Sequence, residues 1–476
     1  MLEKLFKLKE HGTDVKTEVV AGLTTFMTMA YIIALNPNLL TGFGAYGQEL
    51  WNAVFLATCI ASAFGTILMA ILANKPFAMS SGMGLNSFFA VVVANIATIA
   101  GVSYVEGYQA GLIIILIEGV IFLILSVLNV RQKIVEAIPL GVRLGISPGI
   151  GLMLMNIGFG SNVGVYTANG GPYYVMGNFF ASLSAGNLAS ELGPEGWTTM
   201  ILTVVTIFVG VFAIIALNHK GVKGSVLYGM LIASVVYWVG ELVFLGINPF
   251  ASLATASWVP PFKDMAALTL CKFNWATFKS LGAVTIITLV LTFGIIDMFD
   301  TIGTVVGTAS RAKMVDENGN VPNMKEILTS DAVGTIAGAC TGTSTITTFI
   351  ESASGVEAGG RTGLTALVTG LTFAACMFIA PIAALIPAAA TSAALIYVGI
   401  LMLQGLANID LSDIATAAPV FIMVLAMPIS GSIGHGIGLG LISYSVIKLL
   451  TGKGKDVTAL TWIISLIFLV KFFVAL

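Results

Sequence analysis

Apolar segments of about 20 residues, the length that crosses the hydrocarbon core of a bilayer, follow one another along nearly the whole of this chain. Hydrophobic residues make up 57% of the 476 residues and charged residues only 9%, whereas soluble domains carry about 25% charged residues. The sequence therefore predicts an all-α polytopic membrane protein. A transmembrane β-barrel would instead show short segments of alternating hydrophobicity, and this pattern does not occur in the sequence.

Fourteen apolar segments form the main series of expected spans. They lie at 19–36, 51–73, 78–100, 110–130, 134–157, 197–217, 224–247, 281–309, 328–342, 344–359, 362–386, 388–407, 413–430 and 432–450. A further apolar stretch at 457–475 is either a surface helix or another span. In residues 1–18, leucines and a phenylalanine alternate with lysines, which predicts an amphipathic helix lying on the membrane surface.

The distribution of basic residues predicts the orientation. Most lysines and arginines fall on the side of the membrane that carries the N-terminus, and the opposite side receives only Lys263, Lys272 and Lys279. Cytoplasmic loops carry the excess of positive residues. We therefore expect a multi-pass protein of the cell (inner) membrane with a cytoplasmic N-terminus.

Matching positions in the two halves of the chain indicate an internal repeat. The matches are Ile138-Pro139 and Gly151 with Ile386-Pro387 and Gly399, Gly65-Thr66-Ile67 with Gly334-Thr335-Ile336, and Gly221 and Gly224 with Gly431 and Gly434. They predict seven-span repeats at 19–250 and 281–450, followed by a C-terminal segment at 451–476. Because seven is odd, the second repeat is expected to cross the membrane inverted, an arrangement typical of transporters.

The third and tenth spans are interrupted at corresponding places. Span three opens with the glycine- and serine-rich segment 79–87, and span ten opens with 342–350, whose β-branched residues favour extended chain. Each is expected to form a short strand followed by a half-helix, at Phe88 to Ala97 and at Glu351 to Ala358. Non-helical backbone at membrane depth must be buried in protein or line a cavity. The two strands are therefore expected to pair with each other, antiparallel.

Carboxylates lie within these apolar segments. Asp297 and Asp300 are three residues apart in the span at 281–309, so they share a helix face, and Glu351 opens the span-ten half-helix. A charge at this depth costs about 2.5–3.5 kcal/mol on insertion scales, which makes an intramembrane acid a candidate functional residue. Asn86 and Ser87 on span three are expected to converge with these acids.

The other side chains near these acids suggest the kind of ligand. Phe26 and Phe349 offer flat apolar faces, and Thr301, Thr304 and Ser352 supply hydroxyls. A planar heterocycle rich in N–H groups suits such a lining, because carboxylates accept paired N–H donors and rings stack on aromatic faces.

Four segments resemble the AzgA-like purine permeases, a branch of the nucleobase–cation symporter family related to the uracil permease. They begin at Gly22 (GLTTFMTMAY), Gly82 (GMGLNSFF), Asp297 (DMFDTIGT) and Thr347 (TTFIES). The resemblance covers nearly the whole chain. It implies a core domain at about 19–130 and 281–386, a gate domain at about 134–250 and 388–476, and proton-coupled uptake of adenine, guanine or hypoxanthine.

The resemblance also implies roles for individual residues. Asp300 takes the position of the span-eight carboxylate that contacts the base in the uracil permease, Glu351 takes that of the span-ten carboxylate, and Thr304 stands where that relative has a histidine. The full set expected at the substrate is Phe26, Asn86, Ser87, Phe88, Asp300, Thr301, Phe349, Ile350, Glu351 and Ser352. Asp297, Asp300 and Thr304 are expected to serve proton coupling.

Partners follow from the same reading. We expect a purine base and a proton, in preference to sodium because no sodium cage is evident, together with membrane lipid; the resemblance suggests a homodimer through the gate domains. The four cysteines and three histidines are scattered, so neither a metal nor a cofactor is expected. Nothing in the net charge of −2 points to nucleic acid.

Alternative readings stay open at this point. Glu351 fits a capping box with Thr348, and Asp300 fits a helix-packing partner. Glu118, Arg143 and Glu241 are read as structural pairs or as side chains that snorkel to the interface. For the whole protein, the alternatives to a purine transporter are an anion or other nucleobase transporter of the same fold, a channel and, far behind, an intramembrane aspartyl protease. We do not expect an enzyme.

Overall fold

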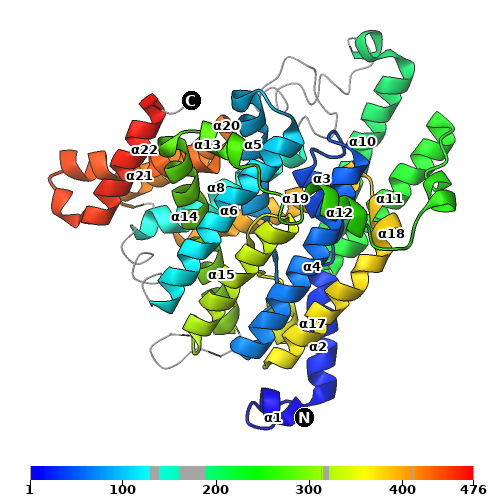
Figure 1. The fold of residues 1–476 in the computed structure, drawn as a ribbon, viewed down its shortest axis with the longest axis horizontal. Helices are drawn as coiled ribbons and strands as arrows, with labels where there is room; N and C mark the ends of the chain where they lie inside the picture. The colour runs from blue at the N-terminus through cyan, green and yellow to red at the C-terminus, as the bar shows by residue number, and fades with distance from the viewer. Residues whose placement is uncertain are drawn as a thin grey trace.

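A computed structural model describes residues 2–128, 139–159, 188–311, 314, 321–409 and 412–474 of the chain. Apart from two short strands it is helical (Figure 1). Ten helices of the described residues are long and apolar enough to cross a membrane, which agrees with the predicted class. Ile138 and the adjoining ends of the spans expected at 110–130 and 134–157 lie outside the described residues.

The elements run in chain order as follows: α1 (Leu2–Phe6), α2 (Val15–Met29), α3 (Ile32–Leu40), α4 (Gln48–Leu72), β1 (Met79–Ser81), α5 (Met83–Ala100), α6 (Tyr104–Val127), α8 (Leu140–Gly158), α10 (Leu188–His219), α11 (Ser225–Gly240), η2 (Glu241–Leu245), η3 (Ala251–Thr255), α12 (Phe262–Leu268), α13 (Trp275–Ser280), α14 (Ala283–Arg311), α15 (Met324–Thr341), β2 (Ile346–Thr348), α16 (Ser352–Glu357), α17 (Gly363–Ala375), η4 (Cys376–Ile379), α18 (Ala380–Ala384), α19 (Ala388–Leu403), η5 (Gln404–Asn408), α20 (Ile414–Ser430), α21 (Ile433–Leu450), η6 (Gly454–Asp456) and α22 (Ala459–Val474).

The helices pack in two groups, and each group draws on both halves of the chain. In the first group, α4 packs against α15 and α17, α6 against α15, and α2 against α17; α4, α15 and α17 run side by side in Figure 1. In the second group, α8 packs against α19 and α20, α10 against α11 and α19, and α20 against α21. The half-helix of span three contacts both groups, because α5 packs against α6 of the first group and against α8 of the second.

The two interrupted spans pair as the sequence predicted. β1 and β2 form an antiparallel two-stranded sheet in which Met79 faces Thr348, Ser80 faces Thr347 and Ser81 faces Ile346. Thr66 on α4 both donates to the carbonyl of Met79 and accepts from its N–H, each at 2.9 Å. Side-chain hydroxyls of neighbouring helices thus satisfy backbone groups that the short ladder leaves unpaired, as burial in an apolar bundle requires.

The prediction for the start of the span-three half-helix was wrong. The helix begins at Met83, not at Phe88, and Gly82 is its N-cap. The N–H of Asn86 donates to the Gly82 carbonyl at 2.8 Å, so the glycine-containing segment already forms the first helical turn. A glycine lowers helix propensity by about 1 kcal/mol, and tertiary packing overrides that preference here.

The span expected at 19–36 also differs from the prediction. It consists of α2, which starts earlier at Val15, and α3, which follows after Ala30 and Tyr31. Pro37 lies inside α3 and removes a helical donor. The interruption at Ala30 and Tyr31 brings the Tyr31 side chain into the interior, where it is fully buried.

Matched glycines from the two halves meet at helix crossings. A Cβ atom on Gly151 of α8 would lie 2.6 Å from the carbonyl oxygen of Gly399 of α19, and a Cβ on Gly399 would lie 2.6 Å from the carbonyl oxygen of Gly151. Gly65 and Gly334 both lie against Met79 and Ile346, the outer residues of the two strands. These close approaches require residues without a side chain.

The stretch at 457–475, for which the sequence allowed either a surface helix or a further span, forms α22. It packs against α21 and α14 at one edge of the molecule (Figure 1). Phe468 is buried in that contact, whereas Leu466 and Phe473 on the same helix are exposed. One face of α22 therefore packs on the bundle, and its other face presents apolar side chains outward.

Candidate functional site

The polar run that leads into β2 connects the site to the surrounding helices. The Thr343 hydroxyl accepts from Asn36 Nδ2 at 2.9 Å and shares a hydrogen bond with the Ser81 hydroxyl at 2.7 Å. Ser344 donates to Asn86 Oδ1, and Thr345 donates to Glu118 Oε2 at 3.2 Å. The hydroxyls of Thr347 and Thr301 are 2.7 Å apart. Each hydroxyl in this run is satisfied by a different element, which fixes the extended backbone at the centre of the bundle.

Glu351 lies at the N-terminal end of α16 and is half-buried. Its Oε1 accepts a hydrogen bond of 2.7 Å from the Tyr31 hydroxyl. The capping-box reading is wrong, because α16 has no side-chain cap and the buried Thr348 hydroxyl has no hydrogen-bond partner. The Glu351 side chain instead turns toward the break between α2 and α3, and its Oε2 accepts no hydrogen bond from the described residues.

Asp300 lies on α14 opposite the start of the other half-helix. Its Oδ2 is 3.4 Å from the position that a Cβ would take on Gly82, the N-cap of α5. The side chain is half-buried, and its carboxylate accepts no hydrogen bond from the described residues. Its charge interacts with those of Asp331 and Glu351. Acids from α14, α15 and α16 therefore converge on one region, as the sequence predicted for Asp300 and Glu351.

Asp297 and Thr301 lie deeper than Asp300, and both are fully buried. Thr301 Oγ1 is 2.9 Å from Asp331 Oδ1, 2.7 Å from Thr347 Oγ1 and 3.4 Å from Asp297 Oδ1. A hydroxyl donates only one hydrogen. When Thr301 donates to Asp331, Thr347 must therefore donate to Thr301.

Asp331 and Tyr31 were missed in the sequence reading. Asp331 lies fully buried in α15, within the span expected at 328–342. The same depth argument that selected Asp297 and Asp300 would have selected it. Tyr31 gave no comparable signal, because a tyrosine within an apolar run carries no charge at membrane depth and packs there as an ordinary aromatic side chain.

Several expected ligand residues serve the backbone of the site. Asn86 is fully buried, and its Nδ2 donates to the Ser81 carbonyl at 3.2 Å. The Ser87 hydroxyl bonds back to the Gly84 carbonyl at 2.8 Å, and the Ser352 hydroxyl accepts from the Ala78 N–H at 3.0 Å. These three side chains hold the two half-helices and β1 in place.

The expected apolar residues divide between packing and exposure. Phe88 packs against Phe293 with ring centres 4.7 Å apart, and Phe26 meets Phe373 edge-on at 5.2 Å. Phe349 is buried beside the strands, whereas Ile350 is 55% exposed.

Thr304 lies one turn beyond Asp300 on α14 and is half-buried. Helix geometry places it on the same face of α14 as Asp300; its role in proton coupling stays a prediction.

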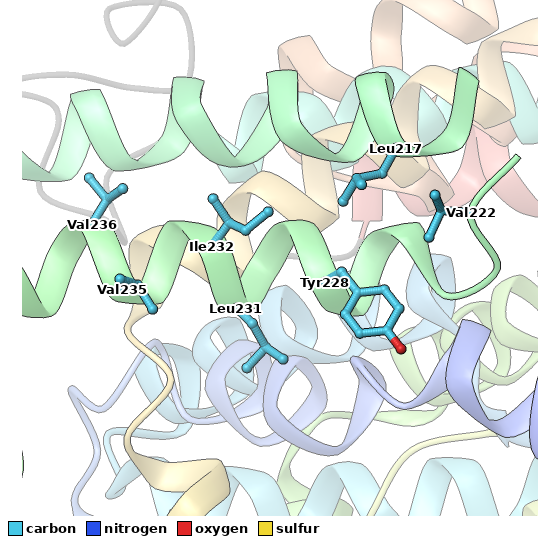
Figure 2. A pocket seen from close by; sticks show the side chains of 7 residues that line it. All are labelled: Leu217, Val222, Tyr228, Leu231, Ile232, Val235 and Val236. Carbon is cyan, nitrogen blue, oxygen red and sulfur yellow. The ribbon is translucent and has the colours of Figure 1, made fainter. Parts of the chain in front are cut away.

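A second hollow, seen in Figure 2, is not this site. It is a groove of about 600 Å³ between α10 and α11, lined by Leu217, Val222, Tyr228, Leu231, Ile232, Val235 and Val236. Its lining is almost wholly apolar and carries no ionisable side chain that would order a polar ligand. The exposed side chains of α11 suit contact with hydrocarbon.

Comparisons with known proteins agree with the geometry. Residues 16–439 match the Permease family. The chain is 37% identical to the adenine permease AdeP of Escherichia coli, in an alignment that covers 99% of this chain and 96% of that protein. It is also 37% identical to the guanine/hypoxanthine permease PbuO of Bacillus subtilis, with 99% of this chain and 100% of that protein covered. Among solved structures, the transmembrane domain of the cyanobacterial bicarbonate transporter BicA matches with a TM-score of 0.61 at 17% identity, over 88% of this chain and 96% of that one.

The structural likeness to BicA shows a shared transporter fold, and the sequence likeness extends over the full length of the permeases. The relatives are transport proteins and not enzymes. The chain therefore belongs to the Permease family, among relatives that carry purine bases across membranes.

Proposed function

We propose that the protein is a secondary active transporter that imports a purine nucleobase (hypoxanthine, guanine or adenine) by proton symport. The observation that carries this proposal is the placement of Glu351. A carboxylate that Tyr31 positions at the start of a half-helix, and whose second oxygen accepts no hydrogen bond from the described residues, can accept an N–H of a purine. The permeases named above support the same class of substrate.

Asp300 is proposed to carry the co-transported proton. Its carboxylate has no hydrogen-bond donor among the described residues and shares its region with Asp331 and Glu351. Neighbouring carboxylates disfavour simultaneous ionisation, so a proton taken up by one of them relieves repulsion within the group. Asp297 and Thr304 are proposed to support this step from the same helix.

Alternating access is proposed to arise from movement of the first helix group, the core, against the second, the gate. Reciprocal approach of Gly151 and Gly399, and the shared packing of Gly65 and Gly334 on the strands, support inverted seven-span repeats, which put the site where the halves meet. We infer fourteen spans, a cytoplasmic N-terminus in the cell membrane, and a homodimer through the gate.

Anion transport is the closest alternative, because a bicarbonate transporter shares the fold. The acids argue against it. Asp297, Asp300, Asp331 and Glu351 give the region a negative potential that repels anions and attracts protons.

Uptake of labelled hypoxanthine into proteoliposomes tests the proposal. Unlabelled adenine, guanine or hypoxanthine should compete, whereas uracil and sulfate should not. An inside-negative potential of 100 mV contributes about 2.3 kcal/mol per proton, so both this potential and an inward proton gradient should accelerate uptake. Uptake that ignores both gradients contradicts proton symport.

A matched pair of variants separates the site from the rest of α16. Glu351→Gln should abolish binding and uptake, whereas Glu357→Gln, on the same helix but exposed and paired with Lys223, should leave both unchanged. Retained base binding in Glu351→Gln would remove that residue from the site.

A further inference from the structure

A polar cavity of about 820 Å³ lies at the end of the bundle that carries the N-terminus. Its walls come from four separate parts of the chain: the N-terminal segment with Lys7 and His11, the loop after α4 with Asn74 and Lys75, the residues before α15 with Asn323, and Arg361 just before α17. With the proposed orientation this cavity opens to the cytoplasm. It is separate from the purine site.

Lys75 is the distinctive residue of this cavity. Only 6% of it is exposed, and its ammonium group has no hydrogen-bond or ion-pair partner in the part of the chain that the structure describes. Burial lowers the pKa of the Lys75 side chain, because removal of water disfavours the charged form. Buried charges in proteins are ordinarily paired. A buried ammonium group that lines a cavity without a partner among the described residues therefore indicates that an anion binds in this cavity.

Arg361 adds oriented donors to the same cavity. Its Nη1 donates to the carbonyls of Val356 at 2.6 Å and Gly360 at 2.8 Å, which fixes the guanidinium plane. Its Nε and Nη2 donors have no partner among the described residues. A guanidinium held in this way suits the geometry of a phosphate oxygen pair.

The cavity has an excess of positive charge. Glu10 is the acid in its lining, and this carboxylate is already paired with Lys7 at 3.3 Å on the exposed rim. Among the described residues that line the cavity, no other carboxylate balances the positive charges of Lys75 and Arg361. A divalent anionic group balances them.

The walls of the cavity are fixed by side-chain hydrogen bonds. Asn74 donates to the Phe6 carbonyl at 3.2 Å and accepts from the Gly363 N–H at 2.8 Å, so it ties the N-terminal segment to the start of α17. Asn323 donates to the Ala73 carbonyl at 3.2 Å. Phe6 is fully buried below them, which anchors the N-terminal segment. The donors are thus held in place without a ligand.

We propose that this cavity is a binding site for a phosphate group, with Lys75 and Arg361 as its ligands and Lys7 at its rim. The volume falls within the range of small-molecule sites, about 300–1,000 Å³, so a phosphomonoester with an organic moiety fits better than inorganic phosphate alone. Two sources supply this chemistry: a free phosphorylated metabolite such as a nucleoside monophosphate, and the headgroup of an anionic phospholipid.

Thermal unfolding of the full-length protein in nanodiscs tests the proposal and separates these sources. In neutral phosphatidylcholine, adenosine monophosphate should raise the unfolding midpoint, whereas adenosine, which lacks the phosphate, should not. A headgroup source is indicated if the midpoint rises only when phosphatidic acid, whose headgroup is a phosphomonoester, replaces part of the phosphatidylcholine. Either response should disappear in Lys75→Met and persist in Lys325→Met, which removes an exposed lysine at the same end of the bundle.

Isothermal titration gives the size of the effect. Hydrogen bonds to charged groups correspond to about 10–100-fold in affinity, so Lys75→Met should weaken adenosine monophosphate binding by that factor or more, and Lys7→Gln, at the rim, by less. Glu351→Gln should leave this binding unchanged, which distinguishes the cavity from the purine site. The proposal is overturned if neither ligand nor lipid shifts the midpoint, or if Lys75→Met responds as the unmodified protein does.

Discussion

The Tyr31 hydroxyl donates a 2.7 Å hydrogen bond to Glu351, a residue 320 positions away in the sequence. Tyr31 lies at the break between α2 and α3, and Glu351 at the start of α16, so the pair links two interruptions of regular helix. Each interruption would leave backbone groups unpaired. The pair therefore ties the junction of α2 and α3 to the start of α16 and fixes the position of one carboxylate.

Removal of this donor should weaken substrate binding without unfolding the protein. Tyr31→Phe keeps the ring and deletes the hydroxyl, so Glu351 loses one charged hydrogen bond, worth about 1.5–3 kcal/mol. We expect the KM for purine uptake to rise about tenfold or more. Tyr104→Phe is the control, because the Tyr104 hydroxyl donates to the Leu40 carbonyl, at 2.8 Å, and not to an acid of the site. Equal effects of the two changes would argue against a role of Tyr31 in the site.

Asp300→Asn should separate base binding from proton coupling. The amide keeps the shape of the side chain but cannot take up a proton reversibly. We expect base binding by isothermal titration to change little, while accumulation driven by a proton gradient is lost. Undiminished accumulation in this variant would show that another acid carries the proton, with Asp297 and Asp331 the next to test.

Thr301→Val should destabilise the protein through its polar neighbours. Valine has the same shape but leaves the carboxylate of Asp331 and the hydroxyl of Thr347 without their shared partner. An unsatisfied buried polar group costs about 1–3 kcal/mol, and a lower unfolding midpoint in detergent reports this loss. Thr301→Ser keeps the hydroxyl and should restore most of the stability. A midpoint that is unchanged in Thr301→Val would mean that water replaces the missing group.

Gly151→Ala should separate α8 from α19. The added Cβ would lie 2.6 Å from the backbone oxygen of Gly399, and backbone cannot move aside as a side chain can. Overpacking of this kind costs about 1–3 kcal/mol. The control is Gly405→Ala, whose Cβ would lie 3.2 Å from the Pro148 ring and 3.7 Å, an ordinary contact distance, from the Leu144 carbonyl oxygen. Comparable unfolding midpoints for the two variants would contradict the close crossing.

Lys75→Met should stabilise the ligand-free protein in a pH-dependent way. Burial lowers the pKa of Lys75 below its usual value of 10.5, so the folded state holds this proton less tightly than the unfolded state does. The penalty is complete below the folded-state pKa and disappears as the pH rises toward 10.5. The gain in unfolding midpoint should therefore be largest near neutral pH and shrink in alkaline buffer. A gain that is independent of pH would point to packing instead.

Sequence patterns predicted the parts of this site that depend on local composition. The run at 342–350 and the segment at 79–87 are poor helix material, so the strand pair was predictable, as were the acids at apolar depth. The convergence of Asp300 and Glu351 was predicted from the same depth argument together with the family resemblance.

Other features depend on contacts that no local pattern contains. The early start of α5 at Met83 arises from packing, which overrides the low helix propensity of Gly84. The capping-box motif at Thr348 predicted the wrong partner for Glu351, because Tyr31 lies hundreds of residues away and competes successfully for the carboxylate. Such long-range choices are set by the assembled bundle.

The shared ladder of Met79–Ser81 and Ile346–Thr348 has a mechanical consequence. The paired strands link the N-terminal ends of α5 and α16, so these two half-helices cannot move apart from each other without breaking the strand pair. In the proposed transport cycle, the two half-helices should therefore move together with the bound base, while access changes through movement of the surrounding helices.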